Sequence, residues 1–171
     1  MAAAKLIIGD RERPIAIARM TEHDLLTVVE IEEGSGLSPW GWDAYHKELQ
    51  SPEEVIMLVA RADSVDGGGA GDAVVGFIVS RLIGPEVHVY NVAVRPESRR
   101  RGIAAQLLQA VLEWGQRNGA TLAFLEVREG NSVAQNLYRR CGFQVAGRRR
   151  QYYAAPVEDA LLMSVSLRQK P

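Results

Sequence analysis

The chain has 171 residues, of which 47% are hydrophobic and 24% are charged, a composition typical of a single globular domain with a full core. Its formal net charge of −1 at pH 7 gives no overall field that favours nucleic acid or an anionic membrane, so neither is expected as a partner. The single cysteine, Cys141, excludes a disulfide within the chain and a cysteine-based metal site, which fits a reducing cytoplasm.

The first third of the chain predicts one strand followed by two short helices. Thr21 is followed three residues later by Asp24, a spacing typical of a helix N-terminus. An apolar stripe carries this helix to about Glu33, and Gly34 and Gly36 end it. The predicted elements are a strand at residues 15–19, a helix from 21 to about 33, and a second helix that follows the turn at 38–42 and ends near residue 50.

The middle of the chain predicts a run of three strands. The glycine-rich connector at residues 63–72 is typical of a hairpin loop rather than a phosphate-binding loop, because no helix follows it. Pro96 ends the last strand of the run. The predicted strands are residues 55–62, 73–83 and 87–94.

The last third of the chain alternates helices and strands. Gly119 and Gly142 each follow an apolar helical stripe, which is typical of helix C-termini. The predicted elements are a helix that begins with the apolar run 103–114 and ends at Asn118-Gly119, a helix from 131 to 142, and strands at 121–128, 143–153 and 160–167. The order β-α-α-β-β-β-α-β-α-β-β predicts an α+β or mixed α/β single domain around one central sheet. We place this domain at residues 14–168, after an N-terminal extension at residues 1–13.

The connection between the strand at 87–94 and the helix at 103–114 has the features of an anion-binding site. The first backbone N–H groups of a helix have no partner within it and can bind an anion. Gly102 lacks a Cβ, so a phosphate can approach the backbone closely, and the arginines at 99–101 add positive charge. The G-x-G-x-x-G and P-loop nucleotide motifs are absent. The alternative from these residues alone is a solvated basic surface.

The turn Arg99-x-x-Gly102-x-Ala104 resembles the R/Q-x-x-G-x-G/A loop with which the GNAT N-acetyltransferase family binds the pyrophosphate of acetyl-CoA. A second family motif, N-x-x-A-x-x-L-Y-x-x-x-G-F, runs from Asn131 to Phe143, and the resemblance covers about residues 15–167. It implies a GNAT-like fold with a mixed, mostly antiparallel sheet flanked by about four helices, and acetyl-CoA as co-substrate. The residues that it assigns to acetyl-CoA are Val92, Ala93, Val94, Arg99, Arg100, Arg101, Gly102, Ile103, Ala104, Ala105, Asn131, Ala134 and Tyr138.

Three further segments are similar to the branch of this family that acetylates protein N-termini, and within it to the ribosomal-protein-alanine N-acetyltransferases. They are L-E-V-R at 125–128, R-R-Q-Y-Y at 149–153 before E-D-A at 158–160, and S-P-W at 38–40. The similarity implies a free protein N-terminus as acceptor, that of a ribosomal protein beginning with alanine. The glycine-rich segment 34–42 and the short loop before Glu158 depart from the pattern, which leaves the peptide preference open. The residues implied to bind the acceptor are Trp40, Asn91, Glu126, Tyr152 and Tyr153.

Glu126 is the candidate general base. Strand alternation puts it on the same face as Leu122 and Phe124, and a carboxylate among apolar neighbours on a central strand is unusual. An α-amine has a pKa near ~8 against ~10.4 for lysine, so it needs only a modest base, often reached through water. The alternative is a structural glutamate that faces solvent or pairs with an arginine such as Arg128.

Tyr138 is the candidate acid, which the resemblance implies would protonate the departing CoA thiolate. The alternative is a core tyrosine, since Tyr138 lies in an apolar helical stripe. Asn131 is expected to cap its helix, and the resemblance adds a hydrogen bond to the pantetheine arm. Backbone groups of Val92 and Val94 are expected to bind the pantetheine amides and the acetyl oxygen. Cys141 is expected to be packing, because no adjacent histidine supports a cysteine nucleophile.

Two other functions stay open. One is a GNAT enzyme for a small amine such as a polyamine or an aminoglycoside, although the only local acidic pair is Glu158 and Asp159. The other is an acyl-CoA-binding regulatory module without turnover. The three histidines are scattered, so no metal is expected, and no apolar run has the length of a membrane span or of a signal-peptide core. We expect a cytoplasmic protein; its oligomeric state is not predictable from these patterns.

Overall fold

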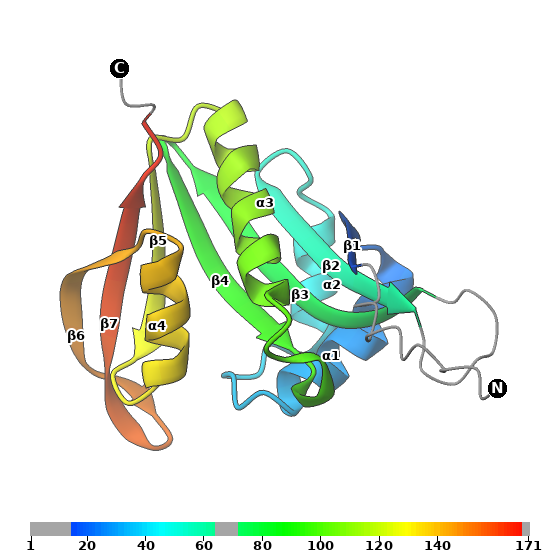
Figure 1. The fold of residues 1–171 in the computed structure, drawn as a ribbon, viewed down its shortest axis with the longest axis horizontal. Helices are drawn as coiled ribbons and strands as arrows, with labels where there is room; N and C mark the ends of the chain where they lie inside the picture. The colour runs from blue at the N-terminus through cyan, green and yellow to red at the C-terminus, as the bar shows by residue number, and fades with distance from the viewer. Residues whose placement is uncertain (1–14, 64–71, 169–171) are drawn as a thin grey trace, which may run out of the picture.

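The computed structural model describes residues 15–63 and 72–168, in which seven strands form one sheet and four α-helices cover it (Figure 1). The strand order is β1-β2-β3-β4-β5-β7-β6, and β4 with β5 is the one parallel pair among the described residues. The strands are β1 (Ile15–Arg19), β2 (Val55–Asp63), β3 (Asp72–Ile83), β4 (Glu86–Val94), β5 (Leu122–Arg128), β6 (Gln144–Ala154) and β7 (Val157–Ser166). The helices are α1 (Leu25–Glu33), α2 (Gly41–Leu49), α3 (Ile103–Arg117) and α4 (Ser132–Arg140).

The predicted order of elements and the mixed, mostly antiparallel sheet are confirmed. Short 3-10 turns precede two of the helices, η1 (Glu22–Asp24) before α1 and η2 (Pro96–Ser98) before α3. The predicted extension at residues 1–13 lies outside the described residues, and so do residues 64–71 of the predicted hairpin loop.

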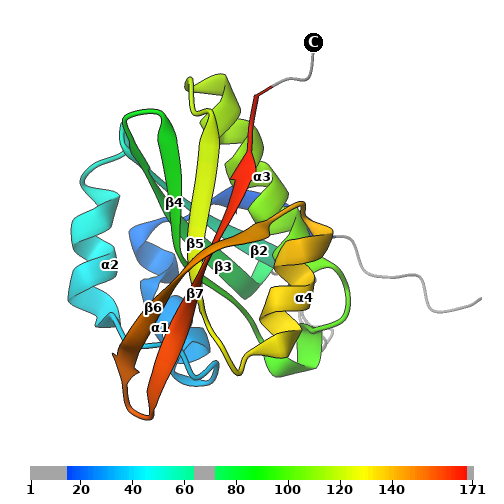
Figure 2. The same ribbon diagram turned by 90° about the vertical axis from the view of Figure 1, so that its left-hand side faces the viewer.

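Helices cover both faces of the sheet, α1 and α2 on one side and α3 and α4 on the other (Figure 2). Successive residues of β2 alternate between the two cores, so Ile56 and Leu58 pack with α3 while Met57 and Val59 pack with α1 and α2. A strand that is buried on both faces needs apolar residues at nearly every position, which explains the continuous apolar run of β2.

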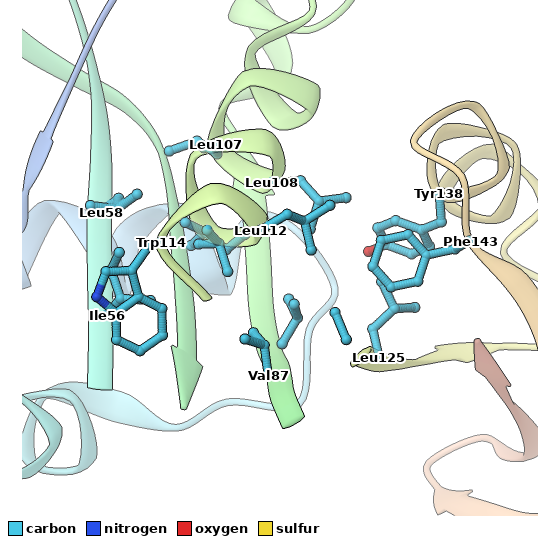
Figure 3. Close-up of a cluster of buried hydrophobic side chains, with 14 of the residues drawn as sticks. Ile56, Leu58, Val87, Leu107, Leu108, Leu112, Trp114, Leu125, Tyr138 and Phe143 are labelled. Carbon is cyan, nitrogen blue, oxygen red and sulfur yellow. The ribbon is translucent and has the colours of Figure 1, made fainter. Parts of the chain in front are cut away.

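Helix α3 is the centre of the larger core (Figure 3). Its Leu107 and Leu108 are fully buried, and burying a leucine side chain stabilises the fold by about 2 kcal/mol relative to leaving it exposed. The helix ends at Arg117 with Asn118 as its C-cap, where Asn118 and Gly119 predict its end. Gly115 lies inside the helix, and a Cβ there would collide with the side chain of Val87, so this glycine allows close packing of α3 on β4.

The parallel pair of β4 and β5 is short and then opens. The two strands pair only from Glu86 with Leu122 to Val89 with Leu125, and they diverge toward their C-terminal ends (Figure 1). The pairing of β3 with β4 shifts register between Val79 and Ser80, which leaves Tyr90 as an extra residue in β4. A bulge of this kind re-aims the side chains that follow it.

Candidate active site

A cleft of about 1300 Å³ opens where β4 and β5 diverge. It is lined by the α1–α2 loop, the C-terminal half of β4, the turn into α3 with the first turn of that helix, the end of β5, one side of α4 and Tyr153 of β6. The predicted site residues that line it are Val92, Ala93, Val94, Arg99, Arg100, Gly102, Ile103, Ala104, Ala105, Glu126, Asn131, Ala134, Tyr138 and Tyr153. Four predicted site residues, Trp40, Asn91, Arg101 and Tyr152, are not among its lining residues.

Two parts of this lining differ in how they are built. The helix wall consists of the lining residues between Val92 and Ala105. The loop wall consists of the lining residues 35–38 together with Tyr90. Glu126 and Tyr138 line the same cleft from β5 and α4.

The helix wall is a strand, a tight turn and a helix N-terminus. Gly102 has φ +70°, and Arg100 before it also has a positive φ of 62°. The first backbone bond of α3 runs from the Gln106 N–H to the Gly102 carbonyl, so the N–H groups before Gln106 have no partner within the helix. A Cβ at Gly102 would meet no atom within 4 Å, so the positive φ, rather than crowding, is the reason for glycine here.

Positive charge gathers at this wall from two elements. Arg99 and Arg100 line the cleft from the turn, and Arg140 lines it from the last turn of α4. Sequence reasoning missed Arg140, because a basic residue at a helix C-terminus is ordinarily explained by the helix dipole. Arginines beside free helix N–H groups make a site that fits a pyrophosphate.

The edge of β4 that faces the opening is partly free. Val92 and Val94 lie beyond the last β4–β5 pair, so β5 does not bind their backbone groups. The Val94 carbonyl accepts a hydrogen bond of 3.2 Å from Arg99 Nε. The Val94 carbonyl was expected to be free for a pantetheine arm. Because Arg99 already occupies one of the two acceptor positions of that oxygen, one position remains for such a ligand.

Glu126 lies in β5 on the same face as Leu122 and Phe124, as strand alternation predicts. Its side chain is 24% exposed, and Oε1 lies 2.8 Å from Nε of Arg149. The arginine partner is therefore Arg149 of β6 rather than Arg128, which pairs with Glu158. The ion pair is partly exposed to solvent and leaves the Glu126 carboxylate on the cleft, so the structural contact does not remove Glu126 as a candidate base.

Tyr138 belongs both to the core and to the cleft. It is 8% exposed, and its ring centroid lies 6.2 Å from that of Phe143 (Figure 3). Burial, followed by the charges of Tyr153 and Cys141, raises the pKa of the Tyr138 phenol to about 12. This raised pKa keeps the hydroxyl protonated near neutral pH. Because the hydroxyl makes no hydrogen bond to another described residue, its proton is free to be donated into the cleft. Burial likewise raises the pKa of the Cys141 thiol, which disfavours a thiolate nucleophile there.

Near the loop wall the structure places Tyr90 where Asn91 was expected. The bulge in β4 leaves Tyr90 on the cleft with 40% exposure, whereas Asn91 is 7% exposed and donates to the Tyr45 hydroxyl at 2.8 Å. Trp40 lies behind Tyr90, with 5.5 Å between the ring centroids. Sequence reasoning missed Tyr90, because a bulge depends on strand pairing and has no signal in a single strand.

The remaining predicted polar residues shape the loops around the cleft. Asn131 caps α4 as predicted, its Oδ1 accepting from the Ala134 N–H at 3.1 Å. Glu158 accepts from the Gly130 N–H at 2.6 Å and from Arg128, which lies over the ring of Tyr153 at 4.0 Å. Asp159 accepts from Arg148 and from the Gln151 N–H. Within the described part of the chain both acids of the E-D pair are thus already engaged.

No group of three or more histidine, cysteine, aspartate or glutamate side chains in residues 15–63 and 72–168 is placed to hold a metal ion. None of the helices in these residues has the length and apolar character needed to cross a membrane.

Comparison with known proteins agrees with the fold and the motifs. The chain is 35% identical over 156 residues to an N-alpha-acetyltransferase RimI of Mycobacterium tuberculosis, with 88% of this chain and 91% of that protein covered. It is 29% identical over 153 residues to a [ribosomal protein bS18]-alanine N-acetyltransferase of Salmonella typhimurium, with 88% and 97% covered. The crystal structure of the Escherichia coli ribosomal-protein-S18-alanine N-acetyltransferase superposes with a TM-score of 0.76 at 24% identity, covering 92% and 97%. Residues 25–143 match the acetyltransferase (GNAT) family, and the chain therefore belongs to that family of N-acetyltransferases.

Proposed function

We propose that this enzyme transfers the acetyl group of acetyl-CoA to the free N-terminal amine of a protein, a ribosomal protein that begins with alanine. The observation that carries the proposal is the single cleft that joins the start of α3 to Glu126 and Tyr138. The acceptor class is supported by the names of the relatives, which are alanine N-acetyltransferases of a ribosomal protein. A ribosomal-protein substrate places the reaction in the cytoplasm.

The residues of the helix wall fit acetyl-CoA, which supplies an activated acetyl thioester. The N–H groups at the start of α3, with Arg99, Arg100 and Arg140, hold the pyrophosphate. Backbone groups at Val92 and Val94 orient the pantetheine arm and the acetyl oxygen through hydrogen bonds. Asn131 adds a side-chain contact to the same arm from the N-terminus of α4.

Glu126 and Tyr138 divide the proton transfers. As the amine nitrogen forms its bond to the acetyl carbon and the carbon–sulfur bond breaks, Glu126 takes the proton that the amine loses, directly or through a water. Tyr138 gives its phenolic proton to the departing sulfur and is later reprotonated by solvent. Its raised pKa keeps that proton in place at neutral pH.

The acceptor is an α-amine because the base is a weak one. About a tenth of α-amines are already neutral at pH 7, whereas lysine needs on the order of 3 kcal/mol more to lose its proton. The carboxylate of Glu126 shares a 2.8 Å ion pair with Arg149, so it is better suited to deprotonating an α-amine than a lysine side chain. A polycationic small amine fits less well, because Glu158 and Asp159 are held by Arg128 and Arg148.

A free-CoA release assay tests the proposal. Acetyl-CoA is supplied with peptides beginning with Ala, Ser, Met or Gly, with the same peptides blocked at the N-terminus but carrying lysine, and with spermidine. Turnover only on free N-termini, unchanged by EDTA, is expected. Turnover on spermidine or on blocked peptides would place the enzyme among small-amine or lysine acetyltransferases, and acetyl-CoA binding without any turnover would favour a regulatory binding module.

A further inference from the structure

Glu32, at the end of α1, is a fully buried carboxylate that the proposed chemistry does not use. Its Oε1 accepts hydrogen bonds from the Trp40 N–H at 2.8 Å, from the Tyr45 hydroxyl at 2.6 Å and from Asn91 Nδ2 at 3.4 Å. Its Oε2 accepts from the Gly41 N–H at 3.1 Å. All four partners are donors, so the group only accepts, which is what an ionised carboxylate does.

These donors come from parts of the fold that are otherwise separate. Trp40 and Gly41 form the start of α2, where unpaired N–H groups and the helix dipole favour a negative charge. Tyr45 lies one turn further along α2, and Asn91 lies in β4. Tyr45 also accepts from Asn91 at 2.8 Å, so the three side chains form one connected network.

The network lies directly behind the loop wall. The loop that contributes residues 35–38 to the cleft begins after Glu33 and ends at Trp40, so Glu32 ties the end of this loop to its beginning. The ring of Trp40 lies 5.4 Å from that of Tyr45 and 5.5 Å from that of Tyr90. Tyr90 is thus next to Asn91 in the chain and in ring contact with Trp40, and the loop residues 35–38 lie between Glu32 and the Trp40 N–H that it binds.

We infer that Glu32 is a positioning residue that sets the loop wall for the acceptor peptide; this rests on the proposed function. A glutamine at position 32 has one acceptor oxygen in place of two. Its amide nitrogen would face a donor, such as the Gly41 N–H, and that end of α2 would move away from the carboxyl site. The loop wall would loosen, while the helix wall, which contains none of these residues, would keep its geometry.

Asp24 offers a matched control at the other end of α1. It is also a buried carboxylate, and it accepts from the Thr21 N–H at 2.8 Å and from Arg61 Nη2 at 2.7 Å. Asp24, Thr21 and Arg61 do not line the cleft. Replacing Asp24 by asparagine therefore disturbs a buried polar contact of the same helix without touching the loop wall.

The experiment compares Glu32→Gln with Asp24→Asn. Glu32→Gln is expected to raise the peptide KM about tenfold, the equivalent of one charged hydrogen bond, with the acetyl-CoA Kd within about twofold. Hydrogen exchange at the Trp40 and Gly41 amides is expected to accelerate in Glu32→Gln alone. Asp24→Asn is expected to lower the thermal midpoint and to leave the peptide KM within about twofold of the wild type.

The design separates two kinds of failure. If the wild type acetylates no peptide, the proposed function fails, while the exchange rates still decide whether Glu32 holds the loop. An unchanged peptide KM, or an equal rise in the acetyl-CoA Kd, would overturn the inference. Should Glu32→Gln not fold, Tyr45→Phe carries the same test, because it removes one donor to Glu32 and keeps the ring.

Discussion

Backbone groups build the helix wall of the cleft, whereas side chains from three elements hold the loop wall. The helix wall needs a positive φ at Gly102, small residues such as Ala104 and Ala105, and the free N–H groups of a helix start. The loop wall needs a buried carboxylate at Glu32 and its partners on α2 and β4. The first wall is local in sequence, and the second spans 59 residues between Glu32 and Asn91.

The two walls therefore differ in the amino-acid substitutions that they tolerate. A binding site made of backbone groups keeps its geometry when exposed side chains are substituted, as long as the backbone dihedral angles stay the same. In the proposed function such a site binds the same ligand, acetyl-CoA, in every reaction. A wall held by a polar network depends on each partner, since a buried donor or acceptor that is left unpaired costs about 1–3 kcal/mol. Under the proposed function, a change in the loop wall is therefore expected to alter acceptor binding and to leave acetyl-CoA binding unchanged.

The largest expected effect on activity comes from Glu126, which lines the cleft from β5 and belongs to neither wall. Glu126→Gln keeps the shape of the side chain and removes its ability to take a proton, so kcat on an Ala-peptide should fall by about 100-fold or more. Binding of acetyl-CoA, measured by calorimetry, should not change, because the helix wall does not contain Glu126. The matched control is Glu158→Gln, since Glu158 also pairs with an arginine but does not line the cleft. Equal losses of kcat in both variants would remove the base assignment.

A smaller effect is expected from breaking the helix wall at Gly102. Gly102 and Gly119 flank α3, both have positive φ, and a Cβ at either would meet no atom within 4 Å. Valine is strained at such a φ, so Gly102→Val and Gly119→Val should destabilise the fold by a similar amount, about 1–2 kcal/mol. Only Gly102→Val should weaken acetyl-CoA binding, by about tenfold, because the strained turn carries the N–H groups at the start of α3.

The contrast between a wall that is local in sequence and a wall built from distant segments also explains how much of the site could be predicted from the sequence. The turn 99–104 and the helix cap at Asn131 are short patterns whose local geometry follows from the residues themselves, and they lie where predicted. The strands and helices were also predictable, because apolar periodicity and glycine or proline boundaries are local signals. Helix α3 ends at Arg117 with Asn118 as its C-cap, where the Asn118-Gly119 pair predicts its end.

The parts that sequence reasoning missed are contacts between distant elements. No residue close to Glu126 in the sequence indicates that its ion-pair partner is Arg149, and Arg128 was suggested as a partner because it lies nearer in the sequence. Tyr90 replaces Asn91 at the cleft because of a register shift between β3 and β4. The Glu32 network was missed for the same reason, since three separate segments supply its donors.

Two buried tyrosines, Tyr138 at the cleft and Tyr45 in the network behind the loop wall, should report on alkaline pH. Burial raises the pKa of Tyr138 to about 12, and it raises the pKa of Tyr45 above the usual range, with the Glu32 carboxylate adding to the effect. Above about pH 10 the unfolded chain loses these protons while the folded chain keeps them, so stability falls as pH rises from 10 to about 12. Each tyrosine should contribute a slope of about 1.4 kcal/mol per pH unit.

Urea unfolding of the wild type, Tyr138→Phe and Tyr45→Phe at pH 9 to 11 measures this slope. Each variant should lose only the part of the alkaline slope that its own tyrosine contributes, because the pKa values of the other buried tyrosine and of Tyr152 and Tyr153 are raised as well. Activity of the wild type should not decline between pH 8 and 10 through ionisation of Tyr138. An alkaline limb in kcat that Tyr138→Phe abolishes would contradict the raised pKa.

The smallest expected effect concerns Arg149, which competes with the acceptor amine for Glu126. The pair is exposed on the arginine side, so it contributes no more than about 1 kcal/mol to stability, and Arg149→Gln should leave unfolding nearly unchanged. Without the arginine, the carboxylate keeps its hydrogen bond with Tyr152 but loses its positive partner, so it should attract the incoming ammonium more strongly and the peptide KM should fall by about threefold. Arg148 is the control, because it is a neighbour on β6 that pairs with Glu129 and Asp159 instead. A rise in KM for Arg149→Gln alone would mean that Arg149 orients Glu126 for the amine rather than occupying it.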